Sequence, residues 1–591
     1  MTTARKIESC PTDDIPLELY DASTKTKYQR ARYFGKGGFA KCYEIIDATT
    51  SKSYAGKVVS KKLMVKDSQK EKMTQEISIH RSLSHKNIVQ FYSFFDDKIN
   101  IYIVLELCQR RSMMELHKRR KTITDFECRY YIYQILQGLK YLHDLKVIHR
   151  DIKLGNLFLN EEMTVKIGDF GLATRIEYEG ERKETICGTP NYIAPEILNR
   201  KGHSYEADIW SVGCVMYTLL VGRPPFETKS LKDTYSKIRK CDYRIPTALR
   251  STAADMIVAM LQPHPSKRPS VNKLFGFEFL SGSAIPVSLP TSCLTMPPRA
   301  DQLEYIDRLG NRKPLSMVNG VVAHNAVKQN AHKPSPVKEQ NKMGPTYPNE
   351  KAYQAEVENL QRDLMTLLTE LDKKPSKKNV VMTLENTDPA SQPLFWVSKW
   401  VDYSDKYGFG YQLCDEGVGV LFNDATKLII LANGINVHFI DRHGNETYMT
   451  MEQFPQEIDK KIRLLTYFKR YMSEHLVKTG ASNVTEFDAI SRVPHLFAWF
   501  RTNCAVIMYL TNGTVQLNFS DHVKIILCPL MQAVTVIEPD KNFRTYTFAT
   551  LLEGGCSHDL LEKLRYAADR LEEGRTIERR ITSLSPGKVK Y

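Results

Sequence analysis

The chain has 591 residues, of which 42% are hydrophobic and 26% charged, as in ordinary soluble globular proteins rather than disordered or membrane proteins. No run approaches the roughly 18 apolar residues that span a bilayer, and the first residues, MTTARKIESCPTDD, lack the apolar core of a signal peptide. We therefore expect a cytoplasmic or nuclear protein with no membrane insertion. The net charge of +15 favours anionic partners but does not choose among phosphate-bearing molecules, acidic peptides and nucleic acid.

The length allows about three to four domains, and the first is expected to follow a short N-terminal extension, residues 1–27. Between 28 and 280, strand-like segments come first, and helix-period patterns such as ECRYYIYQILQGLKYLHDL follow. The twelve cysteines are scattered with no CxxC pair, which indicates reduced thiols in a reducing compartment. The pattern predicts one compact domain with a strand-rich front.

A glycine-rich turn, FGKGGFAKCYEI, lies between two of these strand-like segments. Gly35, Gly37 and Gly38 carry no Cβ, so the backbone can approach a phosphate closely. Ala40 stands at the third glycine position of the usual motif, and Cys42 stands where valine is usual. Taken singly, the turn is equally compatible with a plain hairpin.

Lys57 follows in the apolar strand pattern YAGKVVSK, where a buried cation without an anion is costly. Glu76, on the predicted helix QKEKMTQEISIHRSL, is a natural partner, and the ammonium group would then be shared with the phosphates of a nucleotide. On its own, Lys57 is better explained as an exposed strand lysine.

Two further motifs, VIHRDIKLGNLFL and VKIGDFGLA, bring together the groups that phosphoryl transfer requires. Asp151 can accept the proton of an attacking hydroxyl, and Lys153 can neutralise the transferred phosphoryl group. Asn156 and Asp169 can hold a metal ion. Because this reaction needs little covalent help from the protein, positioned charges and Mg²⁺ are the required parts.

These motifs, in this order, resemble the eukaryotic protein kinases over about 250 residues, and Lys153 together with GTPNYIAPE is similar to their serine/threonine branch. The resemblance implies a two-lobed fold with ATP and Mg²⁺ in the cleft. It implies Glu106 and Cys108 as the hinge that faces adenine, with Leu105 behind and Phe158 beneath. It places these residues around the phosphates: Gly35, Lys36, Gly37, Gly38, Phe39, Ala40, Cys42 and Lys57.

The loop RIEYEGERKETICGTP, which precedes Glu196, is charged and carries a candidate switch. A phosphate on Thr185, added by an upstream kinase, would pair with Arg150 and order the loop, although a solvated hydroxyl is the alternative. In kinases the position of Thr189 contacts the catalytic aspartate and lysine, which makes it a poorer phosphosite. Glu196 is expected to pair with Arg268.

Residues 281–350 are rich in Pro, Asn, Ser and Lys, as in AHKPSPVKEQNKMGPTYPNE, and predict a mostly disordered linker. Within it RKPL, from Arg312 to Leu315, fits the RxxL destruction-box pattern that a ubiquitin ligase recognises, but four residues match readily by chance. The basic run HKRRK, residues 117–121, fits either a nuclear import signal or a solvated helix face.

The segment EVENLQRDLMTLLTELDKK then predicts an amphipathic helix that needs a surface to cover. Its apolar residues recur at helical spacing: Val357, Leu360, Leu364, Leu367, Leu368 and Leu371.

The last third of the chain repeats itself with a period near 97 residues. NDATKLIIL at 423–431 aligns with SDHVKIIL at 520–527, and each copy is followed by a helical pattern. The repeat predicts twin β modules, with chance similarity as the alternative. In a strand, His522 and Lys524 would share one face, and the first copy has Ala425 and Lys427 at the matching positions, so only the second copy carries both donors.

FGKGGFAKCYE and YIVLELCQRRSMMELHKRRK, with a linker and a doubled module behind them, resemble the polo-like kinases over nearly the whole chain. The resemblance implies a multidomain α+β protein, in which a bilobal kinase is followed by two tandem β-sheet-plus-helix polo boxes. It assigns 351–394 to a cap helix and connector packed on the first box, 395–478 and 495–575 to the boxes, and 576–591 to a tail.

The resemblance also implies a groove between the boxes that reads Ser-pSer or Ser-pThr motifs on primed proteins. His522 and Lys524 would grip the phosphate, while Trp400, Val401 and Leu476 line the groove beside it. From the residues alone, Trp400 fits a core tryptophan and Lys524 a solvated strand face.

We therefore expect a serine/threonine kinase that acts in mitosis and cell division, at centrosomes, kinetochores, the spindle and the midbody, with protein partners and no direct nucleic-acid partner. A non-enzymatic phosphopeptide-binding scaffold is the alternative for the first domain. A dimerisation module is the alternative for the repeats.

Overall fold

The computed structural model describes residues 15–37, 40–64, 67–299, 350–374, 380, 382, 387–475, 491–539 and 542–583. No helix within these ranges is long and apolar enough to cross a membrane.

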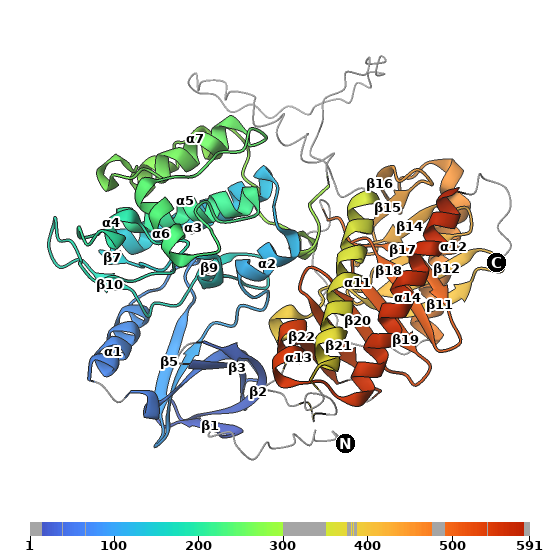
Figure 1. Cartoon of the computed structure of the whole chain (residues 1–591), viewed down its shortest axis with the longest axis horizontal. Coiled ribbons are helices and arrows are strands. Elements are labelled where there is room, and N and C mark those ends of the chain that lie inside the picture. Colours follow the sequence, from blue (N-terminus) through green and yellow to red (C-terminus); the bar gives the residue numbers. More distant parts are fainter. Residues whose placement is uncertain are drawn as a thin grey trace, which may run out of the picture.

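The N-terminal half of the molecule begins with a six-stranded antiparallel sheet in the order β1-β2-β3-β4-β6-β5, with the helix α1 (Asp67–Arg81) beside it (Figure 1). The strand β1 lies inside residues 1–27, which were expected to be an N-terminal extension. Ile15 and Leu19 of this segment are buried in the core of the sheet and so belong to the folded domain. The strands are β1 (Glu18–Asp21), β2 (Thr26–Lys36), β3 (Ala40–Asp47), β4 (Ser53–Ser60), β5 (Phe91–Asp96) and β6 (Asn100–Leu105).

The second lobe is helical and is built around α3 (Asp125–Asp144) and α5 (Glu206–Val221). Thr124 begins α3 with a capping box, in which its side chain accepts from the backbone of Glu127 and the Glu127 carboxylate accepts in return. Both helices are buried in one large core, α5 as an almost wholly apolar helix and α3 with Glu127, Arg129 and Gln134 among its buried residues. Shorter elements complete the lobe: α2 (Met113–Arg120), β7 (Val147–Ile148), β8 (Leu157–Leu159), β9 (Val165–Ile167), β10 (Thr174–Arg175), α4 (Pro195–Leu198), α6 (Leu231–Lys240), α7 (Ser251–Met260), α8 (Val271–Leu274) and α9 (Glu278–Ser281).

The first part of the expected linker is ordered, so the prediction of disorder is wrong for residues 281–299. A 3₁₀ helix, Thr291–Leu294, buries Cys293 and Leu294 in the core of the second lobe. Arg120 of the basic run pairs with buried Glu127 at 2.6 Å and donates to the carbonyl of Met296 at 3.0 Å. A solvated helix face is therefore also wrong for this part of the run. Arg312 and Leu315 lie outside the described residues.

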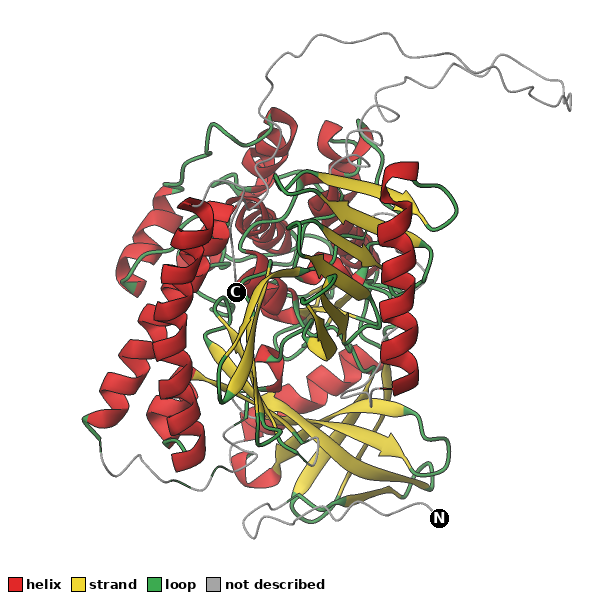
Figure 2. Cartoon of the chain, turned by 90° about the vertical axis from the view of Figure 1, so that its right-hand side faces the viewer, coloured by secondary structure: helices red, strands yellow, loops and turns green. Residues whose placement is uncertain are grey.

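The two repeats fold into two six-stranded antiparallel sheets, and each sheet keeps its strands in chain order. The inner faces of the sheets share one core, in which Tyr411 and Val397 of the first copy bond to Leu496 and Gln516 of the second. Figure 2 shows these strands lying between helices. The strands are β11 (Val397–Tyr403), β12 (Gly408–Leu413), β13 (Val418–Phe422), β14 (Lys427–Ile430), β15 (Asn436–Ile440) and β16 (Glu446–Thr450), then β17 (Leu496–Arg501), β18 (Ala505–Leu510), β19 (Val515–Phe519), β20 (Lys524–Cys528), β21 (Ala533–Ile537) and β22 (Phe543–Thr547).

Each copy ties its closing helix to the same turn, which confirms the repeat. In the first copy, Lys461 of α12 (Asp459–His475) pairs with Asp424 at 2.6 Å. In the second, Lys563 of α14 (His558–Ser583) pairs with Asp521 at 2.9 Å. The short helix α13 (Phe548–Gly554) precedes α14.

The expected amphipathic helix is α11 (Glu350–Asp372), but it packs on the second copy and not on the first as predicted. All six apolar residues of its stripe join a core with α13, α14 and the sheet of the second copy. In Figure 1, α11 and α14 lie side by side. The first sheet is covered by α12 instead, through its own apolar core.

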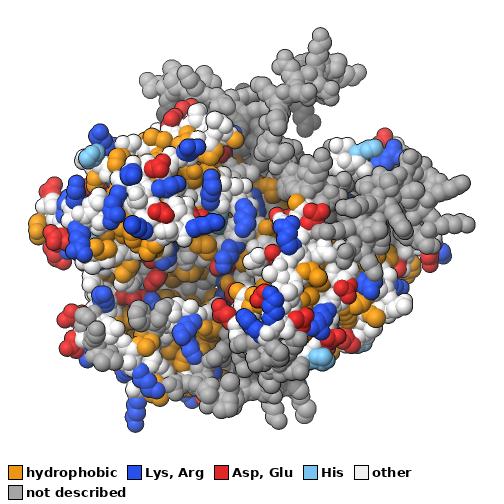
Figure 3. Space-filling model, viewed as in Figure 1, with side chains coloured by type: hydrophobic (Ala, Val, Ile, Leu, Met, Phe, Trp, Pro, Cys, Tyr) orange, Lys and Arg blue, Asp and Glu red, His pale blue; other side chains and the backbone are white. Residues whose placement is uncertain are grey.

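The two halves of the molecule touch through polar contacts. Arg119 of α2 donates to the carbonyls of Ala390 and Gln392 at 2.9 and 3.2 Å, in the connector that precedes the first sheet. The hydroxyls of Ser292 and Ser491 are hydrogen-bonded at 2.8 Å and buried. On the face seen in Figure 3, Lys and Arg side chains are spread among neutral and acidic ones over the N-terminal half.

Candidate active site and inter-box groove

The nucleotide cleft contains the predicted ion pair. Lys57 on β4 lies 2.6 Å from the Glu76 carboxylate on α1 and 3.4 Å from Asp169. Burial alone would lower the pKa of Lys57, but the two carboxylates outweigh burial and raise it above its usual value. The ammonium group therefore stays charged in the cleft, where it can meet a phosphate.

The catalytic loop arranges donors around Asp151, which is 7% exposed. Lys153 donates to the Asp151 carboxylate at 2.7 Å and to the Thr189 hydroxyl at 2.9 Å. Thr189 in turn donates to Asp151 at 2.7 Å, as the kinase resemblance implied. Asn156 donates to the same carboxylate at 3.0 Å. A hydroxyl substrate that replaced Thr189 would meet a carboxylate acceptor already flanked by a cation.

Two residues near the cleft have strained backbone conformations that the surrounding contacts must hold in place. Arg150 and Asp169 have left-handed φ angles of 66° and 61°. The buried Asp208 carboxylate accepts from the backbone N–H of His149 at 3.0 Å and of Arg150 at 2.8 Å. Asp208 thus fixes the turn that presents Asp151.

Asp169 and Asn156 fit a hard divalent cation. The Asp169 side chain is 47% exposed. Partial desolvation raises the pKa of its carboxyl group, but the nearby Lys57 ammonium outweighs this effect and keeps the pKa below its usual value. Asp169 is therefore an anion that faces the cleft. Asn156 adds an amide oxygen from the catalytic loop. Carboxylate and amide oxygens are the ligands that Mg²⁺ takes in proteins, with phosphate and water as the others.

Four buried rings connect the two lobes through tilted and edge-to-face contacts, and no sequence motif predicts them. His80 of α1 lies 5.5 Å from the ring of Phe91 and 4.5 Å from the ring of Phe170, which in turn lies 5.1 Å from His149. His80 also bonds to the carbonyl of Val89 at 2.7 Å, and burial lowers its pKa to about 4. A helical pattern in the sequence gives no signal for such a histidine.

The structure shows the surroundings of the residues that were expected to contact the adenine. Cys42 lies opposite Lys57 across the strand pair, and Phe158 lies under Gly168, where a Cβ would approach its ring to 3.0 Å. Glu106 is paired with Lys166 at 2.8 Å. Burial raises the pKa of the Cys108 thiol. Gly38 and Phe39 lie outside the described residues, whereas Gly35, Lys36, Gly37 and Ala40 form the ends of β2 and β3 and the turn between them.

The activation segment is anchored at one end and exposed at the candidate phosphosite. Glu196 and Arg268 form the predicted pair through two hydrogen bonds of 2.7 and 2.8 Å, and both side chains are buried. Thr185 is exposed. Arg150 is partly buried, and its side chain donates to the carbonyl of Leu172 at 2.6 Å.

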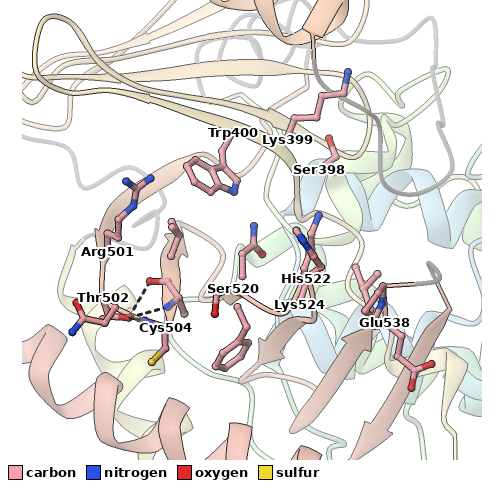
Figure 4. A pocket seen from close by; sticks show the side chains of 17 residues that line it. Ser398, Lys399, Trp400, Arg501, Thr502, Cys504, Ser520, His522, Lys524 and Glu538 are labelled. Carbon is pink, nitrogen blue, oxygen red and sulfur yellow. Dashed lines mark hydrogen bonds between the residues drawn. The ribbon is translucent and has the colours of Figure 1, made fainter.

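The second site is a cavity of about 780 Å³ between the two repeats, shown in Figure 4. Trp400 of the first copy lines it together with His522 and Lys524 of the second. The Trp400 ring is half-buried and stacks on Phe409 at 5.7 Å. Burial lowers the pKa of Lys524, so a bound anion would favour its charged form.

His522 reaches the cavity from a turn and not from a strand, so the expectation of a shared strand face is wrong. The strand β20 begins at Lys524, and His522 has a left-handed φ of 67°. Ala425 in the first copy has a φ of 65°, so both copies use the same turn. The sequence alignment found the correct positions, but a pleated strand was the wrong geometry for them.

Some groove residues differ from those predicted. Val401 packs toward α12 and does not line the cavity, because neighbouring strand residues point to opposite faces. Leu476 lies outside the described residues. Arg501 and Asn518 line the cavity and were missed. The Arg501 guanidinium lies 5.5 Å from the centre of the Trp400 ring, and only the paired folding of the two repeats brings these residues together.

Comparison with known proteins agrees with this architecture. The protein kinase domain model matches residues 28–280, and the model of the duplicated polo-box region matches 405–462 and 502–564. The chain is 62% identical to the serine/threonine-protein kinase polo of Drosophila melanogaster, over 95% of this chain and 97% of that protein. It is 51% identical to the serine/threonine-protein kinase PLK1 of Xenopus laevis, over 95% and 93%, and 45% identical to plk-2 of Caenorhabditis elegans, over 97% and 92%.

A protein kinase domain uses ATP together with a divalent metal ion, and polo boxes bind phosphopeptides. The matches extend over the cleft and over both copies of the repeat. The chain is a serine/threonine protein kinase and belongs to the polo-like kinases.

Proposed function

We propose that Asp151 accepts the proton of a serine or threonine hydroxyl of a protein substrate while Lys153 stabilises the charge on the transferred phosphoryl group. Lys57, held by Glu76 at 2.6 Å, binds the nucleotide phosphates. Asn156 and Asp169 would hold Mg²⁺, which would supply charge neutralisation for the phosphates of ATP. The hinge residues Glu106 and Cys108, with Phe158 beneath, enclose the adenine, and the glycine-rich turn covers the phosphates.

The polo boxes bring this kinase to proteins already phosphorylated in a Ser-pSer or Ser-pThr motif. One observation carries this proposal: Trp400 of one copy and His522 and Lys524 of the other line the same cavity. A cavity with one aromatic wall and two cationic donors suits a peptide that carries a phosphate. The resemblance to the polo-like kinases adds Leu476, which lies outside the described residues, to the residues expected to contact the peptide.

We further propose a role in mitosis and cell division, at centrosomes, kinetochores, the spindle and the midbody, and in both cytoplasm and nucleus. The exposure of Thr185 supports activation by an upstream kinase, through pairing of its phosphate with Arg150. A ubiquitin ligase that recognises Arg312 and Leu315 would limit the lifetime of the protein.

A single experiment tests both phosphoryl transfer by the kinase domain and recruitment of phosphorylated substrates by the polo boxes. The full chain is given ATP and two versions of one protein substrate, which carry a distant Ser-Thr motif either phosphorylated or unphosphorylated. We expect the wild type to prefer the phosphorylated version by about tenfold at low substrate concentration, because binding at the groove raises the local concentration of the acceptor.

Two variants separate the parts. Asp151→Asn should lose at least about a thousandfold in rate on both substrates, and equal rates would refute the catalytic assignment and favour a scaffold. The double variant His522→Ala, Lys524→Met should keep the rate on the unphosphorylated substrate and lose the preference. A preserved preference would rule out the proposed groove.

A further inference from the structure

The inter-box cavity is unevenly charged along its length. Figure 4 shows Trp400 and Arg501 toward one end, His522 and Lys524 further along, and Glu538 beyond them. Among the described residues that line the cavity, Glu538 is the only carboxylate. A groove built for an anionic ligand therefore also presents a negative charge near the position of the phosphate.

Glu538 follows directly after the strand that faces the phosphate-binding lysine. In the pairing of β20 with β21, Lys524 lies opposite Ile537, and Glu538 is the next residue. Opposed residues of antiparallel strands have Cα atoms about 5 Å apart, and an extended peptide advances about 3.3 Å per residue. Glu538 is therefore within reach of a ligand residue about one to three positions from the phosphorylated residue.

The Glu538 carboxylate keeps capacity for a ligand. Its described ion pair, with Arg544, is long at 3.8 Å, and the Glu538 side chain is 36% exposed. The backbone is fixed by a hydrogen bond from the Glu538 N–H to the carbonyl of Asn542 at 3.1 Å. A carboxylate has about four acceptor positions, so one distant guanidinium does not saturate it.

A carboxylate at the edge of the phosphate site acts on the ligand residues beside the phosphate. A ligand that carries Lys or Arg on this side is attracted to Glu538, whereas a ligand with Asp, Glu or a second phosphate is repelled. The effect falls on one side of the phosphate alone, because the other end of the cavity carries the Arg501 guanidinium.

We propose that Glu538 is a specificity residue of the polo-box groove, which selects phosphorylated ligands with a basic residue on the side of the phosphate away from Trp400. The inference rests on the proposed reading of phosphopeptides by this groove. It narrows the substrate class to primed proteins whose phosphosite is followed, in the direction of Glu538, by positive charge.

The test uses the full chain and fluorescent phosphothreonine peptides with a common Ser-pThr centre. Lys, Gln or Glu is placed at each of the three positions on either side, and dissociation constants are measured by fluorescence polarisation at low and physiological salt. On one side only, we expect Lys peptides to bind about threefold to tenfold more tightly than Glu peptides, with a smaller ratio at higher salt. Glu538→Gln should bring the ratio close to one, and Glu538→Lys should invert it.

Asp569→Lys is the matched control, because Asp569 is an exposed carboxylate of α14 that does not line the cavity. Asp569→Lys makes the same change in net charge as Glu538→Lys and should keep the wild-type ratio of Lys-peptide to Glu-peptide binding. Equal binding of Lys and Glu peptides by the wild type, or an unchanged ratio in Glu538→Gln, would overturn the proposal while phosphate-dependent binding remained. If no phosphopeptide bound more tightly than its unphosphorylated form, the proposed reading function and this inference would both fall.

Discussion

At the scale of single residues, the two lobes of the kinase depend on a histidine that must remain neutral. His80 is 3% exposed. The aromatic rings that it contacts belong to a strand of one lobe and to the motif that carries Asp169. A second proton on this imidazole would place a positive charge among buried aromatic rings. Desolvation of this kind depresses the basicity of a buried imidazole.

This residue predicts a loss of stability in mild acid. The pKa of His80 is about 4 in the folded protein, against 6.5 for an ordinary histidine, so the unfolded chain takes up its proton first. The contribution of His80 is complete above pH 6.5 and is lost as the pH falls toward 4, by up to about 3 kcal/mol. The melting temperature of the kinase domain, measured by calorimetry between pH 4.5 and 7.5, should fall less steeply in His80→Leu. His443→Leu, at an exposed histidine, should keep the wild-type slope, and equal slopes in all three proteins would contradict the prediction.

The charged residues of the cleft were predictable, whereas His80 was not, for a physical reason. Lys57, Asp151 and Asp169 belong to short motifs in which chemistry fixes the residue type at fixed spacing. The pair Lys57–Glu76 followed, since a buried charge needs a partner, and the pair Glu196–Arg268 was expected from the motifs GTPNYIAPE and PSKRPS. No short sequence motif predicts the contacts of the buried rings, because the rings come from four separate segments and meet only in the folded protein.

At the scale of elements, α11 shows how a surface is chosen. Its apolar stripe was readable from the spacing of its leucines, but the sequence did not reveal which sheet the stripe covers. Both copies of the repeat offer an apolar outer face of similar composition. In the folded chain, α12 covers the first sheet, and α14 and α11 together cover the second.

A pair of neighbouring substitutions tests this packing. Leu364 is fully buried against the second polo box, whereas the adjacent Met365 is 49% exposed. Leu364→Ala should destabilise the second box by about 2 to 5 kcal/mol, through lost burial and the cavity that remains. Met365→Ala should change the stability by less than about 0.5 kcal/mol. Chemical denaturation, monitored by hydrogen exchange in β17–β22, measures the change in stability of each variant. A similar small effect of the two substitutions would show that α11 does not stabilise this box.

At the scale of the whole molecule, the kinase domain and the polo boxes are joined by buried polar contacts rather than by a large shared core. Arg119 is 6% exposed and bonds to two carbonyls of the connector. Ser292 and Ser491 meet in a second contact, and Arg299 lies 4.0 Å above the ring of Tyr448 in a third. Interfaces between domains of one chain are commonly of this polar kind and permit relative motion.

Removal of one anchor should therefore loosen the arrangement. Arg119→Ala deletes a charged donor to two carbonyls, an interaction worth about 1.5 to 3 kcal/mol, and should increase the radius of gyration measured by small-angle X-ray scattering. Lys118→Ala, at the exposed neighbour on α2, should leave the scattering curve unchanged. Circular dichroism confirms that both variants remain folded, and identical scattering by Arg119→Ala and wild type would count against this contact.

The shared turn of the two repeats has a consequence for stoichiometry. Duplicated modules commonly bind one ligand each, and the left-handed turns at Ala425 and His522 make the two copies equivalent as scaffolds. Within the described part of the chain, however, both copies contribute to one cavity, with Trp400 from the first and His522 and Lys524 from the second. Titration should therefore saturate at one phosphopeptide per chain. Damage to either copy removes all of the affinity rather than half, so the duplication provides no redundancy.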